Sequence, residues 1–161
     1  MPLLVNLHQL ETKNLQLAGE LAAPELELEQ VDELIHAHQP LKYDLEAQKL
    51  PNAILVQGQL RLDLTCECIR CLKPFPYKLA LKGWACHLPL QGEEQVLVTN
   101  DCVDLTPYMR EDILLEFPRH PLCKPECGGL PRKTTGQIEN PGGSETSKVS
   151  SAWVALNKLK L

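Results

Sequence analysis

The sequence lacks the features that mark a membrane-spanning protein or a common enzyme class. None of its segments contains the roughly 18 consecutive apolar residues that a membrane-spanning helix needs. Residues 1–8 have no basic stretch, no apolar stretch of signal length and no small-residue cleavage site, so we expect a cytoplasmic protein. The chain also has no glycine-rich phosphate loop, and no nucleophile stands beside a base and an orienting group. These absences favour a protein that is not an enzyme.

Cysteine, in contrast, is present in an informative arrangement. Two residues separate Cys68 from Cys71, and three separate Cys123 from Cys127. Two short-spaced pairs supply the four thiolates of a closed tetrahedral zinc site, in which the metal contributes directly to folding. The 51 residues between the pairs exceed the roughly 15 to 20 of a zinc ribbon. The spacing therefore predicts a structural zinc that clamps a domain.

Other interpretations of the cysteines stay open at this point. The chain has three more cysteines without metal-type spacing, and scattered reduced thiols in a core would give a similar count: Cys66, Cys86 and Cys102. A thioredoxin-like redox pair is disfavoured, because no βαβ pattern surrounds Cys68 and Cys71 and two prolines follow them. His120 is a possible substitute ligand for one thiolate, although the adjacent Pro121 constrains its loop.

The net charge of −5 conceals a segregation of charge along the chain. Residues 1–50 contain nine acidic and three basic residues, and residues 91–117 contain seven acidic residues and one basic residue. Residues 58–90 and 118–135, which contain the two cysteine pairs, each have a net charge of +3. Basic residues offset the charge of a four-thiolate zinc centre, and they also suit contact with a polyanion such as RNA.

Alternating apolar and polar residues predict several strands of an antiparallel sheet. The expected strands cover residues 15–21, 41–47, 54–64, 75–81 and 96–98. The first cysteine pair falls between the third and fourth of these, in a hairpin-like connection. Residues 25–38 are acidic with interspersed apolar positions, which suits a strand followed by a helical turn.

One helix is predicted over residues 107–116. Thr106 is a candidate cap, Pro107 suits the first turn, and Pro118 ends the segment. Its apolar residues include Ile113 and Leu115, which we expect to pack on the sheet. An aspartate at either position is then expected to destabilise the fold by several kcal/mol.

Together these elements predict an α+β fold: a curved antiparallel β-sheet packed by one main helix, with a structural four-cysteine zinc site. Residues 1–133 form the expected domain. Residues 134–150 are polar and rich in Gly, Pro and Ser, so we expect a flexible linker. Residues 151–161 return to a helix-like apolar spacing and are expected to form a helical tail.

Three segments resemble one known family when they are taken in order. They are CIRCLKPF at residues 68–75, the run DLTPYMREDILLEFP at 104–118 that leads to Pro-Leu-Cys at 121–123, and WVALNKL at 153–159. As a set they resemble the YceD-like family of large ribosomal RNA subunit accumulation proteins. The resemblance implies a role in accumulation or processing of large-subunit ribosomal RNA, with no established catalytic step. Relatives do not all have a complete cysteine quartet, so zinc is predicted from this chain's own residues.

Two hypotheses for function follow. In the first, a non-enzymatic ribosome-biogenesis factor contacts ribosomal RNA or a pre-ribosomal particle through basic residues near the cysteine pairs: Arg70, Lys73, Lys124, Arg132 and Lys133. In the second, a protein-interaction module binds a basic ribosomal protein through its acidic surface, without touching RNA. A steep salt dependence of RNA binding distinguishes the first from the second. Neither hypothesis involves a membrane.

Overall fold

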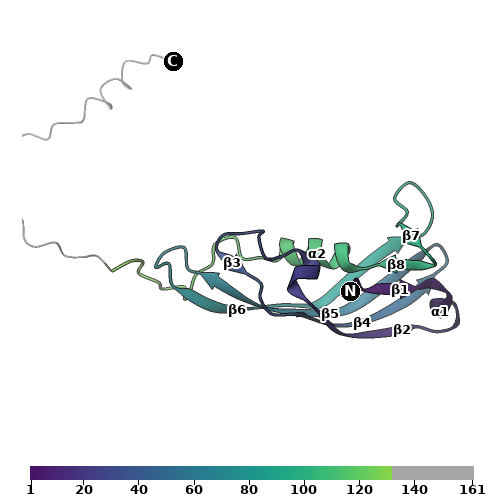
Figure 1. Cartoon of the computed structure of the whole chain (residues 1–161), viewed down its shortest axis with the longest axis horizontal. Helices are drawn as coiled ribbons and strands as arrows, with labels where there is room; N and C mark the ends of the chain where they lie inside the picture. The colour runs from purple at the N-terminus through teal and green to yellow at the C-terminus, as the bar shows by residue number, and fades with distance from the viewer. Residues whose placement is uncertain (132–161) are drawn as a thin grey trace, which may run out of the picture. The chain divides into compact units, whose positions relative to one another are not determined.

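Two antiparallel sheets make up most of the regular structure of Met1–Pro131, the residues that the computed structural model describes (Figure 1). The five-stranded sheet consists of β2 (Leu15–Leu21), β3 (Ile35–His36), β4 (Leu41–Leu50), β5 (Ala53–Glu67) and β6 (Pro74–Pro89). The three-stranded sheet consists of β1 (Leu4–Asn6), β7 (Val98–Thr99) and β8 (Cys102–Asp104). The helices are α1 (Leu7–Thr12), the 3₁₀ helix η1 (Ala23–Leu26) and α2 (Thr106–Leu115). The predicted antiparallel α+β character is confirmed.

The strands follow the predicted pattern closely, with two differences. The alternating runs at residues 15–21, 41–47, 54–64 and 75–81 all lie in strands. Between residues 25 and 38 the order is the reverse of the expected one, because the helical turn η1 comes first and the short strand β3 follows. The last predicted strand begins later than expected, at Val98. The predicted linker and tail, residues 134–161, lie outside the described residues.

The hairpin of β5 and β6 supplies the two longest strands of the larger sheet. Its strands pair from Ala53 opposite Pro89 to Glu67 opposite Pro74, with a β-bulge where the register shifts beyond Gly58. Gly58 has φ 155°, and a Cβ there would lie 2.1 Å from the Asp44 carbonyl oxygen, so no larger residue fits.

The bulge explains why the sequence alternation predicts only the first half of β6. Leu79 is buried before the bulge, whereas Trp84 and Leu88 are buried after it, so the inward-facing positions change from odd to even numbers. An alternation rule therefore ends the strand near residue 81, although pairing continues to Pro89.

Helix α2 packs on the inner face of the sheet through fewer residues than predicted. Met109 and Ile113 are fully buried, and the Trp84 indole donates a 2.6 Å hydrogen bond to the Asp112 carboxylate. The prediction for Leu115 is wrong: its side chain is 77% exposed. It lies two residues beyond Ile113, and a helix advances by 100° per residue, so the two side chains point to different sides.

The start of α2 also differs from the prediction. Thr106 is the first helical residue rather than the cap, and Leu105 precedes it without a side-chain capping bond. The Asp104 carboxylate instead accepts a 2.9 Å hydrogen bond from the Thr106 N–H. The Thr106 hydroxyl accepts one of 3.0 Å from the Leu3 N–H, so it joins the helix to the N-terminal segment.

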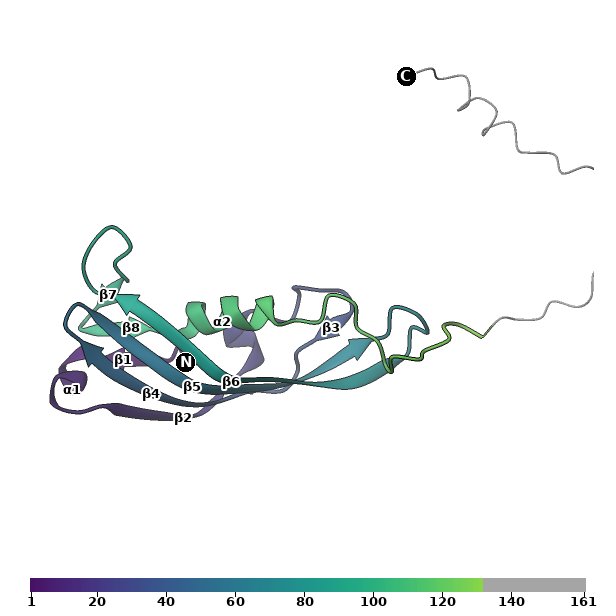
Figure 2. The ribbon, with the colours of Figure 1, turned by 180° about the vertical axis from the view of Figure 1, so that it is seen from behind.

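The core lies between α2, η1 and the inner faces of both sheets (Figures 1 and 2). Alternate residues of β5 fill its centre, and Leu26 and Leu28 add to it from the segment around η1. In Met1–Pro131, no helix is long and apolar enough to cross a membrane. The core fixes the directions of β5, β6 and α2, which lead into the two cysteine pairs.

Candidate metal centre

The first cysteine pair lies in the connection between β5 and β6. Cys68 directly follows the last residue of β5, and its side chain is fully buried. The loop closes through two backbone hydrogen bonds, Leu72 N–H to the Cys68 carbonyl (2.9 Å) and Cys68 N–H to the Lys73 carbonyl (3.0 Å). Leu72 has φ 59°, the left-handed conformation that turns the chain back into β6. The loop therefore holds two sulfurs at the end of the hairpin.

The second pair reaches the same place from the end of α2. The buried Pro121 comes after the helix, and its carbonyl accepts a 3.0 Å hydrogen bond from the Ile69 N–H of the first loop. The Arg70 guanidinium donates a 3.1 Å hydrogen bond to the Cys127 carbonyl. The two loops are thus bonded through backbone atoms and one side chain, independently of any metal.

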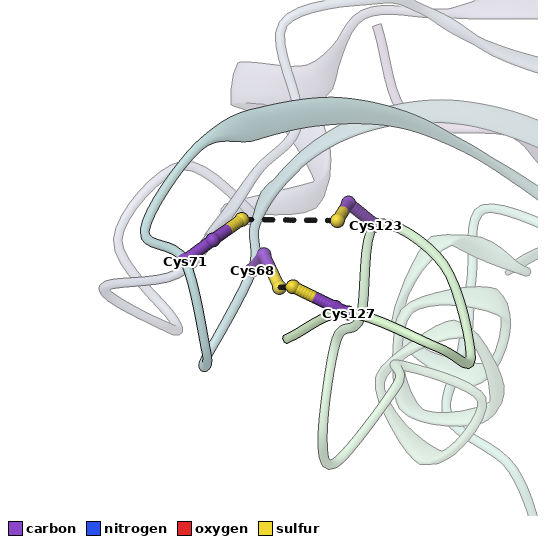
Figure 3. Close-up of side chains that lie close together, drawn as sticks. All are labelled: Cys68, Cys71, Cys123 and Cys127. Atoms are coloured by element: carbon purple, nitrogen blue, oxygen red, sulfur yellow. Dashed lines mark hydrogen bonds between the residues drawn. The ribbon is translucent and has the colours of Figure 1, made fainter. Parts of the chain in front are cut away.

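The four predicted sulfurs converge (Figure 3). The Sγ atoms of Cys68 and Cys127 are 3.7 Å apart, those of Cys71 and Cys123 are also 3.7 Å apart, and all four lie within 4.8 Å of one another. A tetrahedron with Zn–S bonds of about 2.3 Å has S–S edges of about 3.8 Å. All four cysteines are free thiols. The cluster can therefore hold one metal ion of the size and geometry of zinc with little movement.

Hydrogen bonding favours the thiolate form of Cys68. Backbone N–H groups, foremost that of Cys123 and then those of Cys71 and Arg70, lower the pKa of the Cys68 thiol to about 6. The pKa of Cys123 is raised to about 12, first by desolvation and then by its hydrogen bonds with the neighbouring thiols. Cys68 therefore ionises more readily than Cys123 in the metal-free site, and a divalent cation would favour the thiolate form that a metal ligand requires.

Three of the five basic residues predicted to contact RNA lie in the two loops of this cluster. Arg70, Lys73 and Lys124 belong to the two loops and are exposed, although Arg70 is also hydrogen-bonded across them. Arg132 and Lys133 lie outside the described residues. RNA contact by any of the five stays a prediction.

Exposed apolar side chains around the cluster are a feature that the sequence reasoning missed. Ile69 is 41% exposed, Leu72 56% and Leu130 59%. Leucine is an uncommon residue in the left-handed conformation that Leu72 adopts. The sequence signal was two apolar residues: Ile69, which lies between Cys68 and Cys71, and Leu72, which directly follows Cys71.

The remaining cysteines and the histidines stay apart from this cluster. Cys66 is buried, which raises the pKa of its thiol, and burial also raises the pKa of Cys86 to about 11. The imidazole rings of His36 and His38 stack on each other, 5.9 Å apart. Among residues 1–131, Cys68, Cys71, Cys123 and Cys127 form the one group of three or more side chains that could hold a metal.

Comparisons with known proteins agree with the resemblance in the motifs. Two relatives are the uncharacterized protein Rv2926c of Mycobacterium tuberculosis and the uncharacterized protein Mb2951c of Mycobacterium bovis, each 24% identical over 124 residues. The alignment covers 72% of this chain and 60% of each relative, so the chain spans less than two thirds of their length. No solved structure matches the chain. The model of the family described as large ribosomal RNA subunit accumulation protein YceD matches residues 56–160, and the chain belongs to that family.

Proposed function

We propose that the chain is a non-enzymatic ribosome-biogenesis factor that supports accumulation or processing of large-subunit ribosomal RNA in the cytoplasm. Membership of the YceD family is the observation that carries this proposal, because the family's description names accumulation of that RNA subunit. The partner is ribosomal RNA or the pre-ribosomal particle that contains it. Basic side chains beside the four-cysteine cluster suit such a polyanionic partner.

In this proposal one structural zinc binds the four thiolates and joins the β5–β6 hairpin to the segment after α2. The two sulfur separations of 3.7 Å support a tetrahedral ion. A zinc with four thiolates has a formal charge of −2, which nearby Arg70, Lys73 and Lys124 offset. The metal has no catalytic step here. It holds the two basic loops at a fixed spacing.

The RNA-facing surface consists of these loops and the residues that follow them: Arg70, Lys73, Lys124, Arg132 and Lys133. Three of the five belong to loops that are joined by the bond from Ile69 to Pro121 and that from Arg70 to Cys127. Acidic residues dominate 1–50 and 91–117, and they repel phosphates from the rest of the protein. A chain with a net charge of −5 thereby presents one region to RNA.

Reversal of charge tests this proposal. The variant Arg70→Glu, Lys73→Glu and Lys124→Glu should lose co-sedimentation with large-subunit precursors and lower the level of mature large-subunit RNA. The matched control reverses three exposed lysines of β4 and β6, with Lys42→Glu, Lys78→Glu and Lys82→Glu, and should co-sediment like the wild type. Circular dichroism and zinc content show whether each variant stays folded.

The salt dependence of binding adds a second measurement. Several phosphate contacts make affinity fall steeply as salt rises, and the triple variant should flatten that slope. If the triple variant still co-sediments and still supports normal RNA levels, the RNA-facing surface is rejected. A protein-interaction module that binds a basic ribosomal protein through its acidic surface would then replace it.

A further inference from the structure

A second surface lies at the end of the larger sheet that is opposite the cysteine cluster (Figures 1 and 2). A cavity of about 430 Å³ opens there between β1, the β7–β8 hairpin and the first turn of α2. We call it the hairpin groove. Its lining residues include Leu4, Leu97, Asn100, Asp104, Pro107 and Tyr108.

The hairpin groove exposes apolar side chains that the core does not use. Leu97 is 83% exposed and Leu4 is 50% exposed, and the adjacent Val98 is 40% exposed. The proline and tyrosine from α2 add apolar surface on the other wall. Scattered exposed leucines are ordinary, but two that line one hollow together with a proline and a tyrosine indicate a docking site.

The walls of the groove are held by backbone bonds. Asn100 and Asp101 form the two-residue turn of the β7–β8 hairpin with φ 50° and 58°, a conformation that Asn and Asp tolerate well. The Asp101 carbonyl accepts a 2.8 Å hydrogen bond from the Leu7 N–H, and the Leu105 N–H donates one of 2.9 Å to the Leu3 carbonyl. The groove is therefore pre-formed, which lowers the entropic cost of binding.

Charge around the groove indicates what it binds. Of the seven acidic residues in 91–117, Asp104 lines the groove and Asp101 lies at the hairpin turn beside it. The one basic residue of this segment, Arg110, donates a 2.9 Å hydrogen bond to the Leu26 carbonyl. None of the groove's lining residues is basic, and Asp104 is acidic. Asp101 lies at the tip of the hairpin, 3.2 Å from the imidazole of His8. Two carboxylates beside a groove without basic lining residues disfavour RNA phosphates, and the net charge of −5 disfavours a second copy of this chain.

We propose that the hairpin groove docks a basic peptide segment of a partner protein, with an apolar side chain seated beside Leu97 and lysines or arginines facing the acidic rim. The apolar contact supplies most of the affinity, and the charges speed up association and make binding selective for basic segments. This interaction goes beyond the proposed function, since it uses neither the cysteine cluster nor the basic loops. The chain would then have two independent binding surfaces.

Selection of short random peptides displayed on phage tests the proposal. The full chain is the target, and the selected peptides are compared afterwards for binding to a Leu97→Ser chain. Selected peptides should be basic and contain a large apolar residue. In fluorescence anisotropy with a synthetic copy of a selected peptide, Leu97→Ser should weaken binding roughly tenfold. Asp101→Asn should weaken it about threefold, and less at high salt.

Leu115→Ser is the matched control, because it removes an equally exposed leucine from α2 outside the groove and should leave peptide affinity unchanged. Recovery of no peptide, of acidic peptides, or of peptides that bind the Leu97→Ser chain equally well would overturn the proposal. Concentration-dependent dimerisation that Leu97→Ser abolishes would also overturn it and would assign the groove to a second copy of the chain.

Discussion

The two ends of the five-stranded sheet are held in shape by different interactions. At the cysteine end, two loops meet through backbone hydrogen bonds and four sulfurs, and nearby Ile69 and Leu72 are exposed rather than packed. At the hairpin end, Val5 and Val103 are buried in the main core, and β1 pairs along β8. β5 alone is 15 residues long, which at about 3.3 Å per residue separates the ends by roughly 45–50 Å.

This difference predicts that the two proposed surfaces respond to different perturbations. The hairpin end depends on the hydrophobic core that the whole domain shares. The cysteine end has little core of its own, so a metal should add to the order that the hydrogen bonds between its loops already give. Loss of the metal should therefore affect one end, whereas loss of core packing should affect both.

Removal of one thiolate gives the largest expected effect. Structural zinc sites bind with apparent free energies of about 10–16 kcal/mol, so Cys127→Ser should reduce zinc from one equivalent per chain to well under one. Hydrogen exchange should speed up in residues 68–73 and 121–127 and stay unchanged in β8. Cys86→Ser is the control, since Cys86 lies outside the cluster, and it should keep its zinc. Wild-type protein from zinc-replete medium that contains no zinc would contradict the metal site.

A buried charge in the shared core gives the next largest effect. Ile113→Asp places a carboxylate without a partner in the core and should lower the free energy of unfolding by about 3–5 kcal/mol. Leu115→Asp on the same helix should change it by less than about 0.5 kcal/mol, because Leu115 is exposed. Urea unfolding measures both. Equal effects of the two substitutions would show that α2 packs with a different face.

Ionisation of one thiol gives the most local effect, because it is confined to the cysteine end. In metal-free protein the folded-state pKa of Cys68 is about 6, below the ordinary value of 9.0. The group therefore stabilises the fold fully above about pH 9, and its contribution is lost as the pH falls through about 6. Thiolate absorbance should show one ionisation near pH 6 that disappears in Cys68→Ser. Its persistence in that variant would assign the ionisation to another thiol.

Several features of the fold followed from particular residues. Alternation in residues 54–64 predicted β5 because its even-numbered side chains face one core. The two prolines around residues 107–116 bounded α2 to within one residue at each end. The short cysteine spacings identified the ligands of the candidate site, since each spacing is a local property of the chain.

Other features depended on contacts between distant parts of the chain. The bulge beyond Gly58 changes which side of β6 faces inward, and it buries Trp84 against α2. Exposure of Leu115 depends on how α2 rotates on the sheet, which the apolar pattern of the helix alone did not specify.

The strand and helix types, the segregation of charge and the four candidate ligands could be read from the amino-acid sequence, because each depends on neighbouring residues. Convergence of the four sulfurs required the folded chain, since β5 and α2 must first pack on a common core to bring their ends together. The shared groove of Leu4, Leu97 and Tyr108 likewise required folding, because these residues come from three segments that meet only in the folded chain.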